Sequence, residues 1–302
     1  MVKIKDKQYK FLEKLVVPPD QKISLKKDYK TDYDHTSLSK EEGEKLLQEG
    51  LKNLIKLQDK LYAHNEYSVL IVLQAMDAAG KDGAVKHVMS GLNPQGVKVT
   101  SFKTPSKEEL SHDYLWRHYK ALPARGEIGI FNRSHYENVL VTRVHPEYIL
   151  NENIPDVKSI KDIDQKFWEK RFKQINRFEK TLAENGTIIL KFFLYLSKEE
   201  QKNRFLQRID DPSKNWKFSS ADATERQYWD EYMKAYEEML SATSTEYAPW
   251  FVLPADDKWF TRLCLGGILY DQFEKLKINY PQVSDAQKAE LLKVKDQLLK
   301  EK

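Results

Sequence analysis

The feature that most constrains the fold of this chain is the stretch from Val69 to Lys86. Positions 69–73 read VLIVL, an apolar run that is typical of a strand buried on both faces. Small residues around Gly80 and Lys81 follow, and a segment with a helical pattern comes after them. A strand, a small-residue loop and a helix in this order can bind phosphate, because backbone N–H groups and a lysine converge at the loop.

The loop differs at two positions from the common phosphate-loop pattern G-x-x-x-x-G-K-[ST]. Ala75 stands where the first glycine is expected, and Asp82 stands where serine or threonine is expected. An ordinary turn between a strand and a helix is the alternative interpretation. The residues that we predict to contact phosphate here are Ala78, Ala79, Gly80, Lys81, Asp82 and Gly83.

Five apolar segments along the chain have the character of strands, and helical patterns separate them. The predicted strands are residues 69–76, 97–103, 127–132, 187–196 and 249–253. Alternation of strand and helix is typical of an α/β fold, in which a parallel sheet carries helices on both faces. We therefore predict a five-stranded parallel sheet.

Three parts of the chain are predicted. Residues 1–64 form an arm, irregular to about residue 36, and a long helix that begins with a capping box at Ser39 and Glu42 and ends near Tyr62. Residues 65–280 form the main domain, and residues 281–302 form a polar amphipathic helix. Within the main domain, predicted helices at 198–209 and about 220–240 flank a break at Pro212, and this excursion is a candidate for a mobile lid.

Composition excludes several classes of protein. The net charge of +4 is slight for 302 residues, and the basic residues are interleaved with acids, so we expect no nucleic-acid partner. No run approaches the 18 apolar residues of a membrane helix, and the first residues lack the apolar core of a signal peptide. The single cysteine, Cys264, excludes an internal disulfide and a cysteine-based metal cluster. We expect a cytoplasmic protein without a membrane partner.

A second candidate motif begins where the strand at 127–132 ends. In doubly wound sheets ligands bind at the carboxyl ends of the strands, and phosphate-loop enzymes usually have an aspartate there that helps to hold Mg²⁺. This chain has the neutral Asn132, so we assign metal binding to Asp77, with a contact from Asp82 or Asn132 left open. The alternative for Asp77 is an acid that caps the loop. Arg133 follows directly and can bind phosphate oxygens through its planar guanidinium.

Basic residues in the excursion form a third candidate set, which consists of Arg204, Arg208, Lys214, Lys217 and Arg226. Arg204 and Arg208 are four residues apart, hence on one face of a helix, and Lys214 and Lys217 flank Trp216 just after the break. Opposite a phosphate loop these cations would close over a polyanion; the alternative is a solvated surface. Lys103 and Arg117 extend the predicted basic track.

Four motifs together resemble the polyphosphate kinase 2 family. They are Asp77–Gly83, Gly129–Glu137, Asp211–Ser219 and Ala248–Lys258, and the likeness runs from about residue 20 to residue 275. The resemblance implies a thymidylate-kinase-like fold with a three-layer αβα core and a helical lid at about 204–226. It also implies reversible transfer of the terminal phosphate between inorganic polyphosphate and a nucleotide with Mg²⁺ or Mn²⁺, in a homodimer or homotetramer.

The second motif, Asn132-Arg133-Ser134-His135-Tyr136-Glu137, departs from the Asp-Arg-Ser-Trp-Tyr-Asn of most members. This variant resembles the class III subgroup, which phosphorylates both AMP and ADP to ADP and ATP. The resemblance implies catalytic roles for Asp77, Lys81, Arg133 and Glu137, with Glu137 linked to accepting AMP. The alternative for Glu137 is an acid at a helix N-terminus that interacts favourably with the helix dipole. Two rival functions stay open: an ATP-dependent thymidylate-kinase-like enzyme, and a non-catalytic module that binds polyanions.

Overall fold

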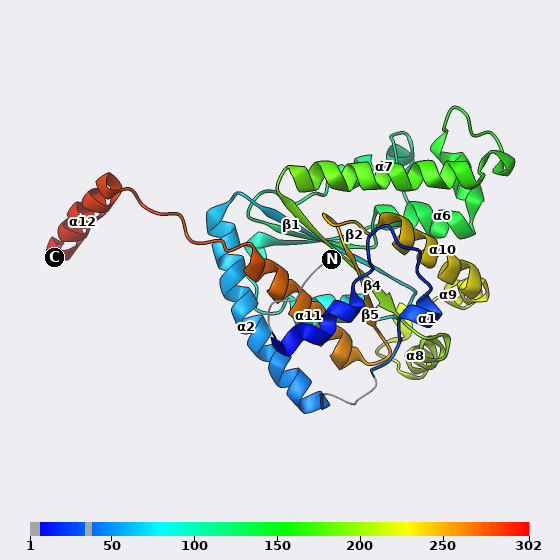
Figure 1. Cartoon of the computed structure of the whole chain (residues 1–302), viewed down its shortest axis with the longest axis horizontal. Helices are drawn as coiled ribbons and strands as arrows, with labels where there is room; N and C mark the ends of the chain where they lie inside the picture. Colours follow the sequence, from blue (N-terminus) through cyan, green and yellow to red (C-terminus); the bar gives the residue numbers. More distant parts are fainter. Residues whose placement is uncertain (1–6, 34–37, 302) are drawn as a thin grey trace.

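A computed structural model describes residues 7–33 and 38–301, without the side chains of Lys7, Gln8 and Lys217. Residues 1–6, 34–37 and 302, which belong to the predicted arm and C-terminal helix, lie outside the described residues. The centre of the molecule is a five-stranded sheet with the order β2-β3-β1-β4-β5, in which every pair of neighbours is parallel (Figure 1). Its strands are β1 Ser68–Ala75, β2 Val97–Ser101, β3 Ile128–Asn132, β4 Thr187–Tyr195 and β5 Trp250–Pro254. The predicted five-stranded parallel sheet is confirmed.

Helices cover both faces of the sheet and make three layers. On one face lie α2 Lys40–His64, α3 Lys81–Val88 and α11 Lys258–Lys275, and on the other lie α7 Gln165–Glu184 and α10 Trp229–Thr243. Side chains alternate along a strand, so Ile71 of β1 joins the first apolar cluster while Val72 joins the second. Every residue of β1 is buried for this reason. The predicted three-layer αβα core is confirmed.

The long helix α2 begins and ends as its sequence indicates. Ser39 accepts a hydrogen bond from the Glu42 backbone N–H at 3.2 Å, and the Glu42 carboxylate accepts one from the Ser39 backbone N–H at 2.8 Å. At the other end Asn65 takes the left-handed conformation, with φ of 55°. Buried leucines at helical spacing, Leu47, Leu51, Leu54 and Leu61, join the first apolar cluster, and α2 packs against α11.

The predicted irregular arm contains a 3-10 helix, η1 Lys7–Leu15, and a short helix, α1 Leu25–Asp28. Tyr9 and Leu12 are buried in the first apolar cluster, and Val16 forms an antiparallel bridge with Phe251 of β5. These apolar contacts order a segment that shows little periodicity in sequence, because tertiary packing overrides weak local preference.

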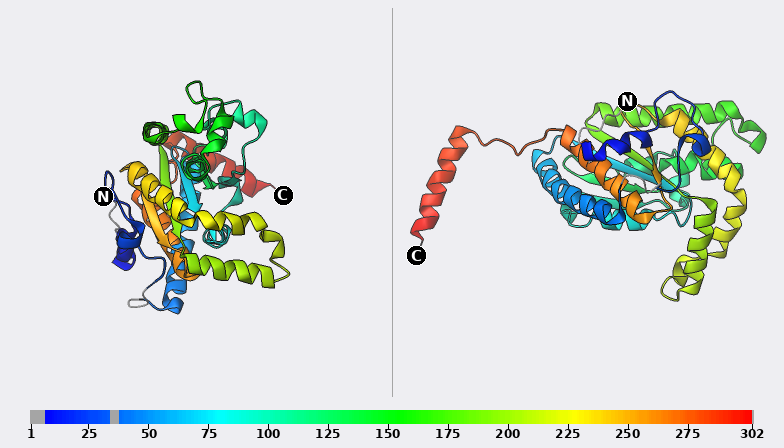
Figure 2. Two further views of the ribbon diagram at one scale, coloured as in Figure 1. Left: turned by 90° about the vertical axis from the view of Figure 1, so that its right-hand side faces the viewer. Right: turned by 60° about the horizontal axis from the view of Figure 1, so that its bottom comes forward.

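The excursion between β4 and β5 contains α8 Lys198–Asp210, η6 Asn215–Lys217, α9 Ser220–Glu225 and η7 Arg226–Tyr228. Figure 2 shows α8 and α9 projecting side by side from the body. The prediction of one helix from about 220 to 240 is wrong, because η7 separates α9 from α10. At this turn the Glu225 carboxylate accepts a hydrogen bond from the Tyr232 hydroxyl at 2.9 Å and lies 3.1 Å from the His145 ring Nε2.

The last helix, α12 Asp285–Lys300, stands away from the body (Figures 1 and 2). All of its residues are exposed, including Leu291 and Leu298. The remaining short elements are η2 Pro94–Gly96, α4 Lys107–Leu110, α5 Trp116–Tyr119, η3 His135–Val139, α6 Val141–Val144, η4 Pro146–Glu152 and η5 Ile160–Asp162. Among residues 7–33 and 38–301, no helix combines the length and apolar character needed to span a membrane.

A buried ionic cluster joins the sheet to the second helical layer. Lys191 of β4 is fully buried, and its ammonium donates to the Glu179 carboxylate at 2.6 Å, the Tyr136 hydroxyl at 2.8 Å and the Thr243 carbonyl at 2.7 Å. The Glu179 carboxylate also accepts from the Tyr136 hydroxyl at 2.7 Å and lies 3.1 Å from the His135 ring Nε2. His135 is therefore a structural residue, as a histidine that opens a helix usually is.

We predict that Lys191→Met destabilises the fold by about 3–5 kcal/mol, because it leaves the buried Glu179 carboxylate without its cation. The measurement is urea unfolding monitored by circular dichroism. The double variant Lys191→Met with Glu179→Leu should recover much of the loss, since both buried charges are gone. As a control, Lys180→Met removes the exposed ion pair between Lys180 and Glu184 of α7, the helix that also carries Glu179. This variant should leave the urea midpoint of unfolding nearly unchanged. Equal losses for Lys180→Met and Lys191→Met would contradict the prediction.

Candidate active site

The loop between β1 and α3 has the backbone shape of an anion-binding turn. Gly80 precedes α3 with φ of 101°, a conformation that glycine adopts without strain. Ala78 has φ of 63°, which is uncommon for a residue with a Cβ atom. The Lys81 ammonium is folded back and donates to the Ala75 carbonyl at 2.9 Å, and burial lowers the pKa of this lysine. The N-terminus of α3 and Lys81 thus present positive charge at one place, which favours a phosphate.

The parallel pairing of β1 with β3 brings the second motif beside this loop. Leu73 pairs with Asn132, so the two strands end at the same edge of the sheet. The Asn132 side-chain amide donates to the Asp82 carboxylate at 2.6 Å, and an Arg133 guanidinium nitrogen lies 3.3 Å from the Asp77 carboxylate. Residues about fifty positions apart in sequence therefore form one polar group. Arg133 holds this position with φ of 62°, a left-handed conformation that is rare for arginine.

Carboxylates near the loop fit a cation that is held mainly by its substrate. Asp77 and Asp82 flank Lys81. Asp222 of α9 comes from the excursion, and burial and the negative charge of Asp77 raise the pKa of its carboxyl. Among the described residues, no group of three or more His, Cys, Asp or Glu side chains could hold a metal by itself. Mg²⁺ is commonly bound by one or two carboxylates together with phosphates and water, and this donor set fits that pattern.

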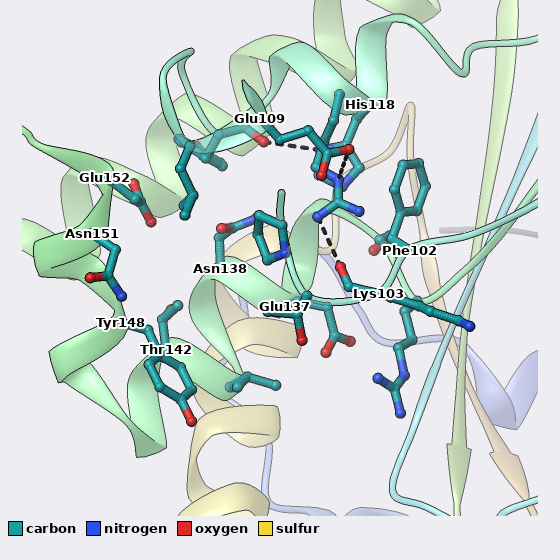
Figure 3. A pocket seen from close by; sticks show the side chains of 18 of the residues that line it. Phe102, Lys103, Glu109, His118, Glu137, Asn138, Thr142, Tyr148, Asn151 and Glu152 are labelled. Carbon is teal, nitrogen blue, oxygen red and sulfur yellow. Dashed lines mark hydrogen bonds and ion pairs between the residues drawn. The ribbon is translucent and has the colours of Figure 1, made fainter. Parts of the chain in front are cut away.

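A cavity of about 340 Å³ opens beside the loop, between the segment after β2 and the elements η3, α6 and η4 (Figure 3). Four of the predicted site residues line it: Lys103, Arg117, Arg133 and Glu137. An Arg117 guanidinium nitrogen donates to the Lys103 carbonyl at 2.9 Å, and its Nε lies 3.1 Å from the Glu109 carboxylate. The cavity has the size of a small-ligand site. Arg133, which lines it and pairs with Asp77, connects it to the loop.

Glu137 lines this cavity together with Glu109 and Glu152, and it is the one that follows Arg133 in the second motif. It is half-buried, and burial raises its pKa although the charges of Arg133 and Lys81 oppose the shift. Perturbed carboxylates that lie beside cations in a cleft are candidates for functional roles.

Arg204 does not lie where the sequence predicts it. It is buried beneath the phosphate loop, and its guanidinium donates to the carbonyls of Ala78 at 3.1 Å and Ala79 at 3.0 Å. Further bonds go to the carbonyls of Ala255 and Asp256 and to the Glu200 carboxylate. All five N–H donors of the guanidinium are thereby used, so the predicted contact of Arg204 with phosphate is wrong in this conformation.

The other predicted basic residues of the excursion follow Arg204 in the sequence. The Arg208 guanidinium lies 5.8 Å from the centre of the Phe205 ring, and the Lys214 ammonium forms an ion pair with Asp211. The side chain of Lys217 lies outside the described ones. None of the described side chains among these lines the cavity.

One residue that contacts the loop was missed in the sequence. The side-chain amide of Gln201 donates to the Asp77 carbonyl at 3.1 Å. Gln201 precedes Arg204 by three positions and so shares its helix face, which is the only sequence signal that could have singled it out.

The raised pKa of Glu137 predicts a pH-dependent stability difference between the protein and the variant Glu137→Gln. Below the ordinary glutamate range, Glu137 is protonated in the folded and unfolded states. As pH rises through that range, the unfolded chain loses this proton at a lower pH than the folded protein does. The free energy of unfolding of the wild-type protein therefore decreases, which means that the protein becomes less stable. The variant cannot titrate, so its stability relative to wild type should increase with pH between about 4 and 7. Urea unfolding across this range is the measurement, and a constant difference would contradict the prediction.

Comparisons with known proteins show which family the chain resembles. The family model "Polyphosphate kinase 2 (PPK2)" matches residues 37–281. A Rhodopseudomonas palustris protein named ADP-polyphosphate phosphotransferase is 50% identical over 299 residues, which cover 99% of this chain and 100% of the relative. A Meiothermus ruber protein named AMP/ADP-polyphosphate phosphotransferase is 45% identical over 279 residues, covering 91% and 97%.

A solved structure extends the likeness to the fold. The crystal structure of polyphosphate kinase 2 from Arthrobacter aurescens TC1 aligns with a TM-score of 0.80 and 39% identity, over 92% of this chain and 98% of that one. The family model spans most of the chain, and the relatives match it over nearly their whole length. The resemblance noted from four sequence motifs is thus confirmed: the chain belongs to the polyphosphate kinase 2 family, whose members are phosphotransferases.

Proposed function

We propose that this enzyme transfers the terminal phosphate of inorganic polyphosphate to AMP and to ADP, forming ADP and ATP, and that the reaction is reversible. The observation that carries the proposal is the position of Arg133, which lines the cavity and also pairs with Asp77 of the phosphate loop. A nucleotide in the cavity would therefore present its phosphate to a donor held by the loop. The names of the two relatives, which specify ADP and AMP/ADP as acceptors, support this choice of substrates.

In the proposed reaction, Lys81 and the backbone amides at the start of α3 bind the terminal phosphate of the donor. An oxygen of the AMP or ADP phosphate attacks the terminal phosphorus in line, and the bond to the bridging oxygen of polyphosphate breaks. Arg133 lies between donor and acceptor and neutralises the charge that spreads over the transferred group. We propose that Arg208, Lys214 and Lys217 bind inner phosphates of the chain as the lid at about 204–226 closes.

We propose Mg²⁺ as the cofactor, with Mn²⁺ as a substitute, held by Asp77 and by Asp82. The bound ion would neutralise negative charge on both substrates. Asp82 already accepts a hydrogen bond from the Asn132 amide. This bond orients the carboxylate and leaves Asn132 as its positioning partner.

Assembly and location are proposals as well. We propose a homodimer or homotetramer in the cytoplasm, which binds neither nucleic acid nor membrane. The exposed leucines of α12, among them Leu292 at 62% and Leu299 at 73%, support self-association because such side chains gain free energy when a second surface covers them.

The deciding experiment supplies AMP, polyphosphate and Mg²⁺ without ATP, and it follows ADP and ATP by chromatography. We expect ADP to accumulate first and ATP to follow. Lys81→Ala and Asp77→Asn should abolish transfer while circular dichroism stays that of the folded protein. Lys86→Ala, which removes an exposed lysine of the same helix, serves as the control and should retain activity.

Three outcomes would contradict the proposal. Transfer from ATP but not from polyphosphate would favour a thymidylate-kinase-like enzyme. Salt-sensitive binding of polyphosphate without turnover on any donor would favour a polyanion-binding module. Near-normal turnover in Lys81→Ala would contradict the role of the loop.

The proposed acceptor range depends on Glu137, which lines the acceptor cavity beside Arg133. We predict that Glu137→Gln lowers kcat/KM for AMP by at least about tenfold, equivalent to about 1.4 kcal/mol, and lowers that for ADP less. The reason is that the shorter acceptor leaves more room for a carboxylate to organise water or metal near its phosphate. Parallel initial-rate assays with AMP and ADP measure the ratio, and equal losses would count against a special role for this residue.

A further inference from the structure

Three consecutive carbonyl groups of the phosphate loop accept hydrogen bonds from one face of α8. The side-chain amide of Gln201 donates to the Asp77 carbonyl at 3.1 Å. Arg204 donates from one guanidinium nitrogen to the carbonyls of Ala78 at 3.1 Å and Ala79 at 3.0 Å. Gln201 is 2% exposed and Arg204 is 4% exposed, so these contacts are shielded from water. Hydrogen bonds in such a setting are strong and costly to leave unmade.

The contacts also tie the loop to two other segments. Arg204 donates to the Ala255 carbonyl at 2.7 Å and the Asp256 carbonyl at 2.9 Å, just after β5. Its Nε donates to the Glu200 carboxylate at 2.7 Å, which balances the buried charge. The guanidinium therefore joins the loop, the end of β5 and the first turns of α8 through one rigid group.

The orientation of the Gln201 amide follows from its other partner. Arg226 of η7, on the returning arm of the excursion, donates to the Gln201 side-chain oxygen at 2.9 Å and to the Lys198 carbonyl at 2.7 Å. Because arginine can only donate, the Gln201 oxygen must face Arg226 and its NH₂ group must face the Asp77 carbonyl. The Gln201 side chain thus connects the loop both to α8, which carries it, and to η7, which contributes Arg226.

The direction of the carbonyls decides the direction of the amides. In a planar trans peptide the C=O and N–H groups point to opposite sides. Holding the carbonyls of Asp77 and Ala79 toward α8 therefore turns the N–H groups of Ala78 and Gly80 away from α8. The N–H of Ala79 closes a turn on the Met76 carbonyl at 3.3 Å. Without the contacts, the peptide that precedes Gly80 is free to rotate, because glycine accepts both signs of φ.

We propose that Gln201 and Arg204 are positioning residues, which fix the loop amides toward the transferred phosphate and couple the lid helix to the phosphate loop. This inference rests on the proposed function of the loop. It assigns Arg204 a place behind the loop, where it sets the backbone. Movement of α8 would then change the conformation of the loop directly, through these hydrogen bonds.

The test uses two variants that remove donors and keep size. Gln201→Glu retains the acceptor for Arg226 but replaces the NH₂ donor by an oxygen that repels the Asp77 carbonyl. Arg204→Lys retains the charge but loses the planar five-donor group. We expect each variant to lower kcat by roughly 10- to 100-fold, since small misplacements of binding groups cost this much. KM for polyphosphate should rise, while KM for AMP stays the same because the cavity belongs to other elements.

Binding supplies a readout that does not depend on turnover. By calorimetry with tripolyphosphate and no nucleotide, we expect both variants to bind at least about tenfold more weakly than wild type, at a temperature where all are folded. Gln48→Glu makes the same chemical change at an exposed position of α2, outside the proposed lid, and should bind and turn over as wild type does.

The outcomes separate this inference from the proposed function. A lowered melting temperature with unchanged tripolyphosphate affinity would show a purely structural role and overturn the inference. Gln201→Glu with wild-type affinity and kcat would overturn it too, and this variant decides the matter if Arg204→Lys fails to fold. A wild-type protein that binds tripolyphosphate but transfers nothing to AMP or ADP would contradict the proposed function alone.

Discussion

The parallel register of β1 and β3 is the constraint on which the site depends. Val69 pairs with Ile128 and Leu73 with Asn132, so both strands reach the same edge of the sheet in step. A shift of one residue would turn every side chain of a strand to the opposite face and exchange the contents of the two apolar clusters. Because apolar side chains fill both faces, that shift is costly, and the position of Asn132 and Arg133 beside the phosphate loop is fixed by the core.

Charge at this edge is balanced at short range. Lys81 and Arg133 bring positive charge to a place where Asp77 and Glu137 bring negative charge, and burial disfavours the charged forms of Lys81 and Glu137. The left-handed conformations of Ala78 and Arg133 add backbone strain, which surrounding contacts must offset. Arg204 supplies such contacts to the carbonyls of Ala78 and Ala79. The buried Lys191–Glu179 cluster supplies them to Tyr136, three residues after Arg133.

Much of the fold could be predicted because its signals are local. The five strands follow from apolar runs, and the start of α2 follows from Ser39 and Glu42. The break between α9 and α10 was not predicted. Glu225, at this break, contacts Tyr232 nearby in the sequence and also His145, which lies in a distant segment and gives no local signal. Arg204 was assigned to phosphate for a similar reason: its spacing from Arg208 predicts a shared helix face but says nothing about what that face meets.

By itself, the sequence determined the kind of fold, the phosphate loop around Gly80 and Lys81, and the family to which four motifs belong, because each depends on short patterns of residues. Only the tertiary structure decided that Arg117, Arg133 and Glu137 share one cavity and that Gln201 and Arg204 face the loop carbonyls. The physical reason is that a side chain's partners depend on which segments the core brings together. Hydrogen bonds between residues more than a hundred positions apart leave no periodicity to read.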